Sequence, residues 1–111
     1  MEINGLQEQD IFIIRLSGRM DTATVQKFTD FIQENETRDS DKIILDMGKL
    51  EYVSSAGLRG LLTYAKKIEA KKGSLLLCSL EGLVKEVFEL SGFNKIFTIT
   101  ADIDEARSRL H

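Results

Sequence analysis

The sequence contains no proline and no tryptophan among its 111 residues, and it has only one cysteine and one histidine. No proline-rich or Gly/Ser-rich stretch divides it, so we expect one domain covering residues 1–111. The longest apolar runs fall well short of the ~20 residues that span a bilayer. The first residues, MEINGLQEQD, lack the apolar centre of a signal peptide. These absences predict a cytoplasmic protein that does not enter a membrane.

The scarcity of cysteine and histidine restricts the available chemistry. Cys78 lies in the apolar segment SLLLCSL, and the only histidine is His111 at the end of the sequence. We therefore predict a buried structural thiol and no internal disulfide, as in a reducing compartment. One cysteine and one histidine cannot build a zinc site, and no phosphate-binding glycine loop or G-x-S-x-G elbow occurs. We expect no metal or cofactor, and a small enzyme or nucleotide hydrolase is the least favoured interpretation.

The charge balance argues against a direct nucleic-acid partner. The formal net charge is -3 and the pI is about 5.2, and no run of lysine and arginine dominates the chain. The densest basic segment is KKIEAKK, residues 66–72. It is typical of the last turns of a helix, where cations interact favourably with the helix dipole. A basic binding patch is the alternative interpretation.

Apolar spacing divides the chain into alternating strands and helices. Short apolar segments predict strands at residues 2–7, 11–16, 42–47, 74–79 and 95–100, the first two joined through EQD as a hairpin. Helical spacing marks four segments, which include Val25–Ile32, Leu58–Ile68, Leu83–Phe88 and Ile103–Leu110. Gly73 is a predicted helix stop. The pattern predicts an α/β fold with a mixed sheet of four or five strands, about four helices and an N-terminal β-hairpin.

The segment LEYVSSAGLRGLL, residues 50–62, has more serine and glycine at a helix start than stability requires. Ser54 or Ser55 can cap the helix, but Gly57 in the first turn costs about 1 kcal/mol relative to alanine. That cost suggests that another molecule approaches the backbone closely. A helix N-terminus also accommodates an anion, so a phosphate on a serine here would be tolerated, with Arg59 helping to neutralise it. The pattern indicates a switch rather than a catalyst.

Two aspartates are further candidates for a polar site. Asp21 precedes the first predicted helix, and Asp46 lies near the end of a predicted strand. A helix cap for Asp21 and a turn residue for Asp46 are the simpler interpretations. A site shared by the two carboxylates is the alternative.

Three segments together resemble the STAS domains, specifically the bacterial single-domain anti-sigma factor antagonists. They are KIILDMGKLEYVSSAGLRGLL (residues 42–62), RLSGRMDTATV (15–25) and GLVKEVFELSGFNKIFTITADIDEA (82–106). The resemblance implies that the unphosphorylated protein binds an anti-sigma factor serine kinase and so releases the sigma factor. Phosphorylation of one serine by that kinase ends the binding, and a metal-dependent serine phosphatase restores it.

Alignment on Gly57 and Leu58 places the family's acceptor serine at Ser55. The implied partner-binding residues are Asp21, Ser54, Ser55, Ala56, Gly57, Leu58 and Arg59. Ser54 stands where many members have aspartate, and Arg59 where several have glycine. One alternative is a STAS docking subunit without phosphorylation, in a stress-signalling or lipid-transport complex. In that case Ser55 is only part of a helix start.

Overall fold

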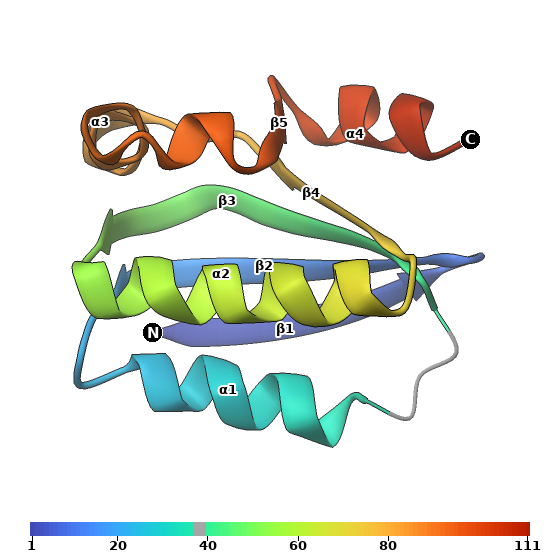
Figure 1. Ribbon diagram of the computed structural model, residues 1–111, viewed down its shortest axis with the longest axis horizontal. Helices are drawn as coiled ribbons and strands as arrows, with labels where there is room; N and C mark the ends of the chain where they lie inside the picture. The colour runs from blue at the N-terminus through green and yellow to red at the C-terminus, as the bar shows by residue number, and fades with distance from the viewer. Residues whose placement is uncertain (37–39) are drawn as a thin grey trace.

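The computed structural model describes residues 1–36 and 40–111. Within them lie five strands and four α-helices: β1 (Glu2–Glu8), β2 (Ile11–Met20), α1 (Val25–Glu34), β3 (Lys42–Val53), α2 (Ser55–Ala70), β4 (Ser74–Cys78), α3 (Gly82–Ser91), β5 (Thr98–Thr100) and α4 (Ile103–Leu110) (Figure 1). A short 3-10 helix, η1 (Phe93–Lys95), precedes β5. The predicted α/β fold and all four predicted helices are confirmed.

The strands form one mixed sheet in the order β1-β2-β3-β4-β5. β1 and β2 are antiparallel and form the predicted hairpin, and Gln9 in its tight turn has a positive φ of 55°. The remaining neighbours are parallel, because a helical segment connects each pair. The carboxyl ends of β2 and β3 therefore lie at the same edge of the sheet, where Met20 is paired with Val53.

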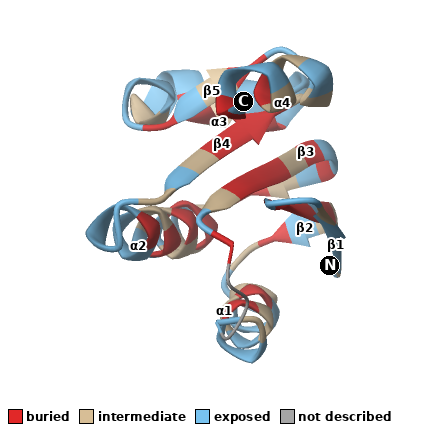
Figure 2. Cartoon of the chain, turned by 90° about the vertical axis from the view of Figure 1, so that its right-hand side faces the viewer, coloured by how far each residue is buried: buried red, intermediate tan, exposed pale blue. Residues whose placement is uncertain are grey.

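Side chains alternate between two apolar layers along each strand, as the period of a strand requires. On β2, Phe12, Ile14 and Leu16 belong to a core that also contains buried residues of α1, α2 and α3. Ile11 and Ile13 point the other way and pack with buried residues of α4. By these clusters, α1, α2 and α3 pack against one face of the sheet and α4 against part of the other. Figure 2 shows buried residues along the strands and on the helices that cover them.

β3 is longer than the predicted strand, which ended at Met47. Its pairing with β2 shifts twice, and each shift leaves one extra residue in β3. The buried residues of β3 therefore change spacing from two to three along Leu45, Met47, Leu50 and Val53. Asp46 is the last residue of β3 paired with β4, and its Oδ1 accepts a hydrogen bond from the Gly48 N–H at 3.0 Å. Asp46 therefore supports a bulge rather than a strand end.

Two predicted boundaries are wrong near the ends of helices. The strand predicted from residue 95 begins only at Thr98, because η1 occupies the preceding residues. α2 ends at Ala70, and the left-handed residue after it is Lys72, with φ 60°, rather than Gly73. Gly73 is required for space, since a Cβ there would lie 2.6 Å from the Asp41 carbonyl oxygen.

Candidate functional site

The junction between β3 and α2 carries the predicted serines. Val53 ends β3 in the core, and Ser54 is the N-cap of α2, with extended backbone at φ -92° and ψ 176°. The Ser54 Oγ accepts a hydrogen bond from the Gly57 N–H at 3.3 Å, and its carbonyl accepts from the Leu58 N–H at 2.9 Å. Ser54, and not Ser55, therefore caps the helix.

Ser55 is the first residue of α2, as predicted, and its side chain is exposed. Its hydroxyl has no hydrogen-bond partner among the described residues, and neither have the N–H groups of Ser55 and Ala56. Arg59 lies one turn further along α2 and is also exposed. A group attached to the Ser55 hydroxyl would thus point into solvent beside a helix N-terminus and would disrupt no existing bond.

Gly57 is required by packing inside the domain. This corrects the sequence-based prediction that another molecule approaches the backbone there. A Cβ at this position would lie 2.7 Å from the Met20 carbonyl oxygen, 2.8 Å from the Val53 Cγ2 and 2.9 Å from the Met20 Cγ. The molecule that approaches the backbone closely is therefore the chain itself, at the end of β2. Gly57 and Leu58 are both buried, so among the predicted partner-binding residues these two support the surface from beneath.

The turn between β2 and α1 is organised by Asp21. Its Oδ1 accepts hydrogen bonds from the N–H groups of Ala23 at 3.0 Å and Thr24 at 3.1 Å. In return, the Asp21 N–H donates to the Thr24 Oγ1 at 2.9 Å. Partial burial acts to raise the pKa of Asp21, but the bonds from Thr24 and Ala23 and the charge of Arg19 hold that pKa below its usual range. Asp21 therefore stabilises the turn that leads into α1, whose N-cap residue is Thr24, and the predicted helix-cap role is corrected to a turn role.

The two junctions meet at the Met20 carbonyl. It accepts a hydrogen bond from the Ser54 N–H at 2.9 Å, and it also limits the space beside Gly57. Asp21 follows Met20 directly, so the β2–α1 turn and the start of α2 are neighbours, as the resemblance implied. Asp46 does not join them, because the partners of its carboxylate are the Arg15 Nε at 3.3 Å and the Gly48 N–H.

Arg19 and Tyr52 are two residues of this region that the sequence analysis missed. The Arg19 guanidinium carbon lies 4.7 Å from the centroid of the Tyr52 ring, and its Nε is 3.7 Å from the Asp21 Oδ2. They face each other because the second register shift of β3 pairs these two positions. Only the register could have revealed this pairing, and the sequence carries no signal for it.

The other chemical candidates lie apart from this junction. Cys78 is fully buried, and burial raises the pKa of its thiol to about 11, which confirms the structural interpretation. Within residues 1–36 and 40–111, no group of three or more His, Cys, Asp or Glu side chains is placed to hold a metal ion. Over the same residues, no helix has the length and apolar content to cross a membrane.

Comparison with known proteins gives matches along nearly the whole chain. The family model described as STAS domain matches residues 2–106. The protein BtrV of Bordetella bronchiseptica, assigned as an anti-sigma factor antagonist, is 37% identical over 89 residues, which cover 80% of this chain and 77% of BtrV.

Solved structures share the fold. A Thermotoga maritima protein assigned as an anti-sigma factor antagonist superposes with a TM-score of 0.87 at 21% identity, covering 96% of this chain and 92% of its own. The Bacillus cell-fate determinant SpoIIAA, solved in unphosphorylated and phosphorylated forms, gives TM-scores of 0.79 and 0.73 at 22% and 21% identity. These cover 98% and 99% of this chain and 96% and 100% of the SpoIIAA chains.

Proposed function

Since this chain belongs to the STAS domain family, we propose that it is an anti-sigma factor antagonist controlled by phosphorylation of Ser55. The observation that carries the proposal is a solvent-exposed serine at the start of α2, whose hydroxyl has no bond to any described residue. BtrV, which is similar along most of its length, is assigned the same regulatory role. The protein is then a cytoplasmic binding protein rather than an enzyme.

The proposed surface lies across the two joined junctions. Ser54, Ser55, Ala56 and Arg59 all reach the surface here, whereas the Asp21 carboxylate is bonded within its own turn. The unphosphorylated surface binds the anti-sigma factor, a serine kinase, and thereby frees the sigma factor. The occurrence of SpoIIAA in both phosphorylation states supports such a cycle.

Phosphorylation would change the surface without changing the fold. A phosphate adds about -1.5 to -2 charges at the positive end of α2, where the N–H groups of Ser55 and Ala56 have no partners among the described residues. The Arg59 guanidinium, one turn away, can reach the same phosphate. The partner instead meets a charge where a neutral hydroxyl had been, so it dissociates. A metal-dependent serine phosphatase then restores the binding form.

Capture from native lysate tests this function. The tagged protein should retain a serine kinase of the anti-sigma type when ADP is present and lose it when ATP is present, because ATP allows phosphorylation. Mass spectrometry should then place phosphate on Ser55. Retention of stable partners without any phosphate under ATP would instead indicate the docking subunit and refute the switch.

We expect Asp21→Ala to lower the melting temperature without changing affinity for the captured kinase. The substitution removes the hydrogen bonds to the Ala23 and Thr24 N–H groups. Circular dichroism and calorimetric titration measure the two quantities. Asp30→Ala is the control, because Asp30 is exposed on α1 and bonds only the Gln26 side chain among the described residues. Unchanged melting with weaker binding would show that Asp21 belongs to the partner surface.

The stabilising effect of Asp21 should depend on pH. Because the folded-state pKa of Asp21 is lowered, its contribution is present above the unfolded-state pKa of about 3.9 and is lost as pH falls through the folded-state value. The difference in melting temperature between wild type and Asp21→Ala should therefore be full at neutral pH and shrink below about pH 4.

A further inference from the structure

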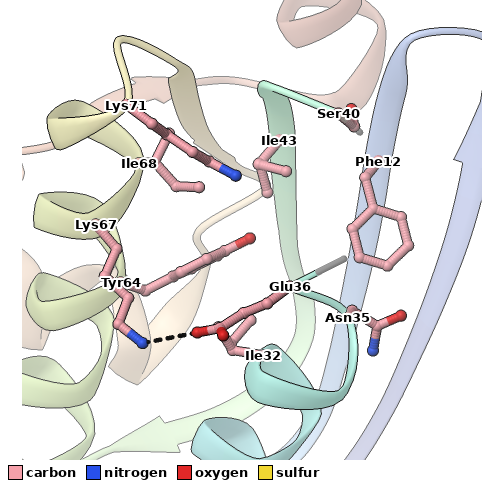
Figure 3. A pocket seen from close by; sticks show the side chains of 10 residues that line it. All are labelled: Phe12, Ile32, Asn35, Glu36, Ser40, Ile43, Tyr64, Lys67, Ile68 and Lys71. Carbon is pink, nitrogen blue, oxygen red and sulfur yellow. Dashed lines mark hydrogen bonds and ion pairs between the residues drawn. The ribbon is translucent and has the colours of Figure 1, made fainter. Parts of the chain in front are cut away.

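Two of the four large apolar side chains that are exposed among the described residues lie on α3. Leu83 is 50% exposed, and Leu90 is 85% exposed. The hollow between α1 and α2 offers much less apolar surface, because Phe12, Ile43 and Ile68 on its lining are at most 3% exposed (Figure 3). A partner that removes apolar area from water can therefore gain more on α3 than in that hollow.

The inward face of α3 already holds the helix in the domain. Val84 and Phe88, one turn apart, are both fully buried in the main core cluster. The Phe88 ring also packs against the Phe97 ring, with 5.8 Å between their centroids. The two leucines lie outside this contact, so attachment of the helix to the sheet does not account for them.

The exposed leucines belong to one stripe along α3. Leu83, Val87 and Leu90 have the spacing i, i+4 and i+7, which places them on a single face about 10 Å long. Val87, between the two leucines, is half-buried. A single exposed leucine is ordinary on a protein surface. Three apolar side chains in register give α3 a second apolar face, and an apolar stripe of this kind is the part of a helix that packs against another element.

The charges beside the stripe have one sign. Glu86 is three residues after Leu83 and four before Leu90, so it borders the stripe, and Glu89 lies one turn further along the same side. Both glutamates are exposed, and neither forms an ion pair with a described residue. The opposite side of the stripe adjoins the buried face of α3. A molecule that covers the stripe therefore meets negative charge along one side of it.

We propose that this stripe, Leu83, Val87 and Leu90, is a docking face for a partner segment that forms a basic amphipathic helix. Its apolar residues would pack on the stripe, and lysine or arginine beside them would face Glu86 and Glu89. A second copy of this chain fits less well, since an antiparallel pair of α3 helices would place the same glutamates opposite one another. One helix pair makes a small interface, so the association is expected to be weak and reversible.

A pair of synthetic peptides tests the proposal by two-dimensional amide NMR on the full chain. The first is an amidated peptide that repeats Leu-Lys-Lys-Leu-Ala-Lys-Lys twice, which gives a leucine stripe on a basic helix. The second has glutamate in place of every lysine. The lysine peptide should give saturable shifts along α3 and bind at least roughly fivefold more tightly than the glutamate peptide. Equal binding of the two peptides, or shifts confined to other elements, would overturn the proposal.

Variants matched in exposure separate the apolar contacts. Leu83→Ser and Leu90→Ser should each weaken binding of the lysine peptide at least roughly threefold. Leu6→Ser is the control, because Leu6 on β1 is also 50% exposed, and its affinity should equal that of wild type. Leu90 has almost no contact with the domain, so Leu90→Ser should melt like wild type and report on binding alone. Equal losses in all three variants would exclude α3 as the docking face.

A second set of variants tests the charges. Replacing both Glu86 and Glu89 with glutamine should weaken the lysine peptide at least roughly fivefold, whereas Glu69→Gln, on the exposed side of α2, should change its affinity less than about twofold. Equal losses would mean that the net charge of the domain attracts the peptide. Ser55→Asp should also bind the peptide within about twofold of wild type, so this result is independent of the proposed switch. Sedimentation of the protein alone should show a monomer, and a dimer that Leu90→Ser abolishes would assign the stripe to a second copy instead.

Discussion

Ser55→Asp is expected to bind the proposed partner, an anti-sigma factor kinase, at least about tenfold more weakly, while melting within a few degrees of wild type. The fold should tolerate the carboxylate, because the Ser55 side chain is exposed and its hydroxyl bonds no described residue. An acidic side chain in the first turn of a helix is stabilising by about 0.3–1 kcal/mol. At a partner surface shaped for a neutral hydroxyl, the same charge costs several kcal/mol, and each ~1.4 kcal/mol is tenfold in affinity. Calorimetric titration with the kinase and thermal melting measure the two effects.

Two serine variants serve as controls for this result. Ser55→Ala should bind the kinase and incorporate no phosphate. Ser54→Ala should remain a substrate of the kinase. It should lose about 0.5–2 kcal/mol of stability, because the Ser54 Oγ, at the N-cap of α2, accepts a hydrogen bond from the Gly57 N–H. Incorporation of phosphate at Ser54, or wild-type affinity of Ser55→Asp, would show that the register taken from the family is wrong.

Gly57→Ala is expected to destabilise the domain by about 2 kcal/mol, although alanine normally favours a helix over glycine. The added methyl group would lie 2.7 Å from the Met20 carbonyl oxygen and 2.8 Å from the Val53 Cγ2. The first contact is with backbone, so relief requires movement of β2 or α2 and weakens the bond from the Ser54 N–H to the same oxygen. Thermal melting should show a decrease of roughly 8 °C for a domain of this size.

Gly60 provides a matched comparison in the same helix. A Cβ there would meet only the Val25 Cγ2, at 2.8 Å, which is the end of a half-buried side chain. We expect Gly60→Ala to stay within about 1 kcal/mol of wild type, because the gain in helix propensity offsets a small movement of Val25. If both variants melt like wild type, the close packing of Gly57 against β2 is not what requires glycine there.

The parts of the fold that could be predicted are those with one uninterrupted period. The α2 apolar series from Leu58 to Ile68 keeps helical spacing, and the burial of the residues at 11–16 and 42–47 follows from continuous apolar character. The second half of β3 could not be predicted, because its two extra residues replace strict alternation with a spacing of three. That spacing is typical of neither a regular strand nor a helix.

The partner-binding role of the candidate site residues stays a prediction, and the contacts among them could not be derived from the sequence. The sequence identifies a serine pair at a helix start, yet only the backbone geometry assigns the cap to Ser54 and leaves the Ser55 hydroxyl without a bond to any described residue. Gly57 was recognised as unusual, and the reason for it depends on Met20, 37 residues earlier in the chain. A contact across that separation arises from the parallel pairing of β2 with β3, which local sequence does not encode.

The position of the Met20 carbonyl has a consequence for the kinetics of recognition. Because it holds the Ser54 N–H and packs against Gly57, the surface around Ser55 is ordered before a partner arrives. Little conformational entropy is then lost on association, and little backbone movement is needed. Phosphate on such a preorganised surface should act mainly by shortening the residence time of the complex, with a smaller effect on the rate of encounter.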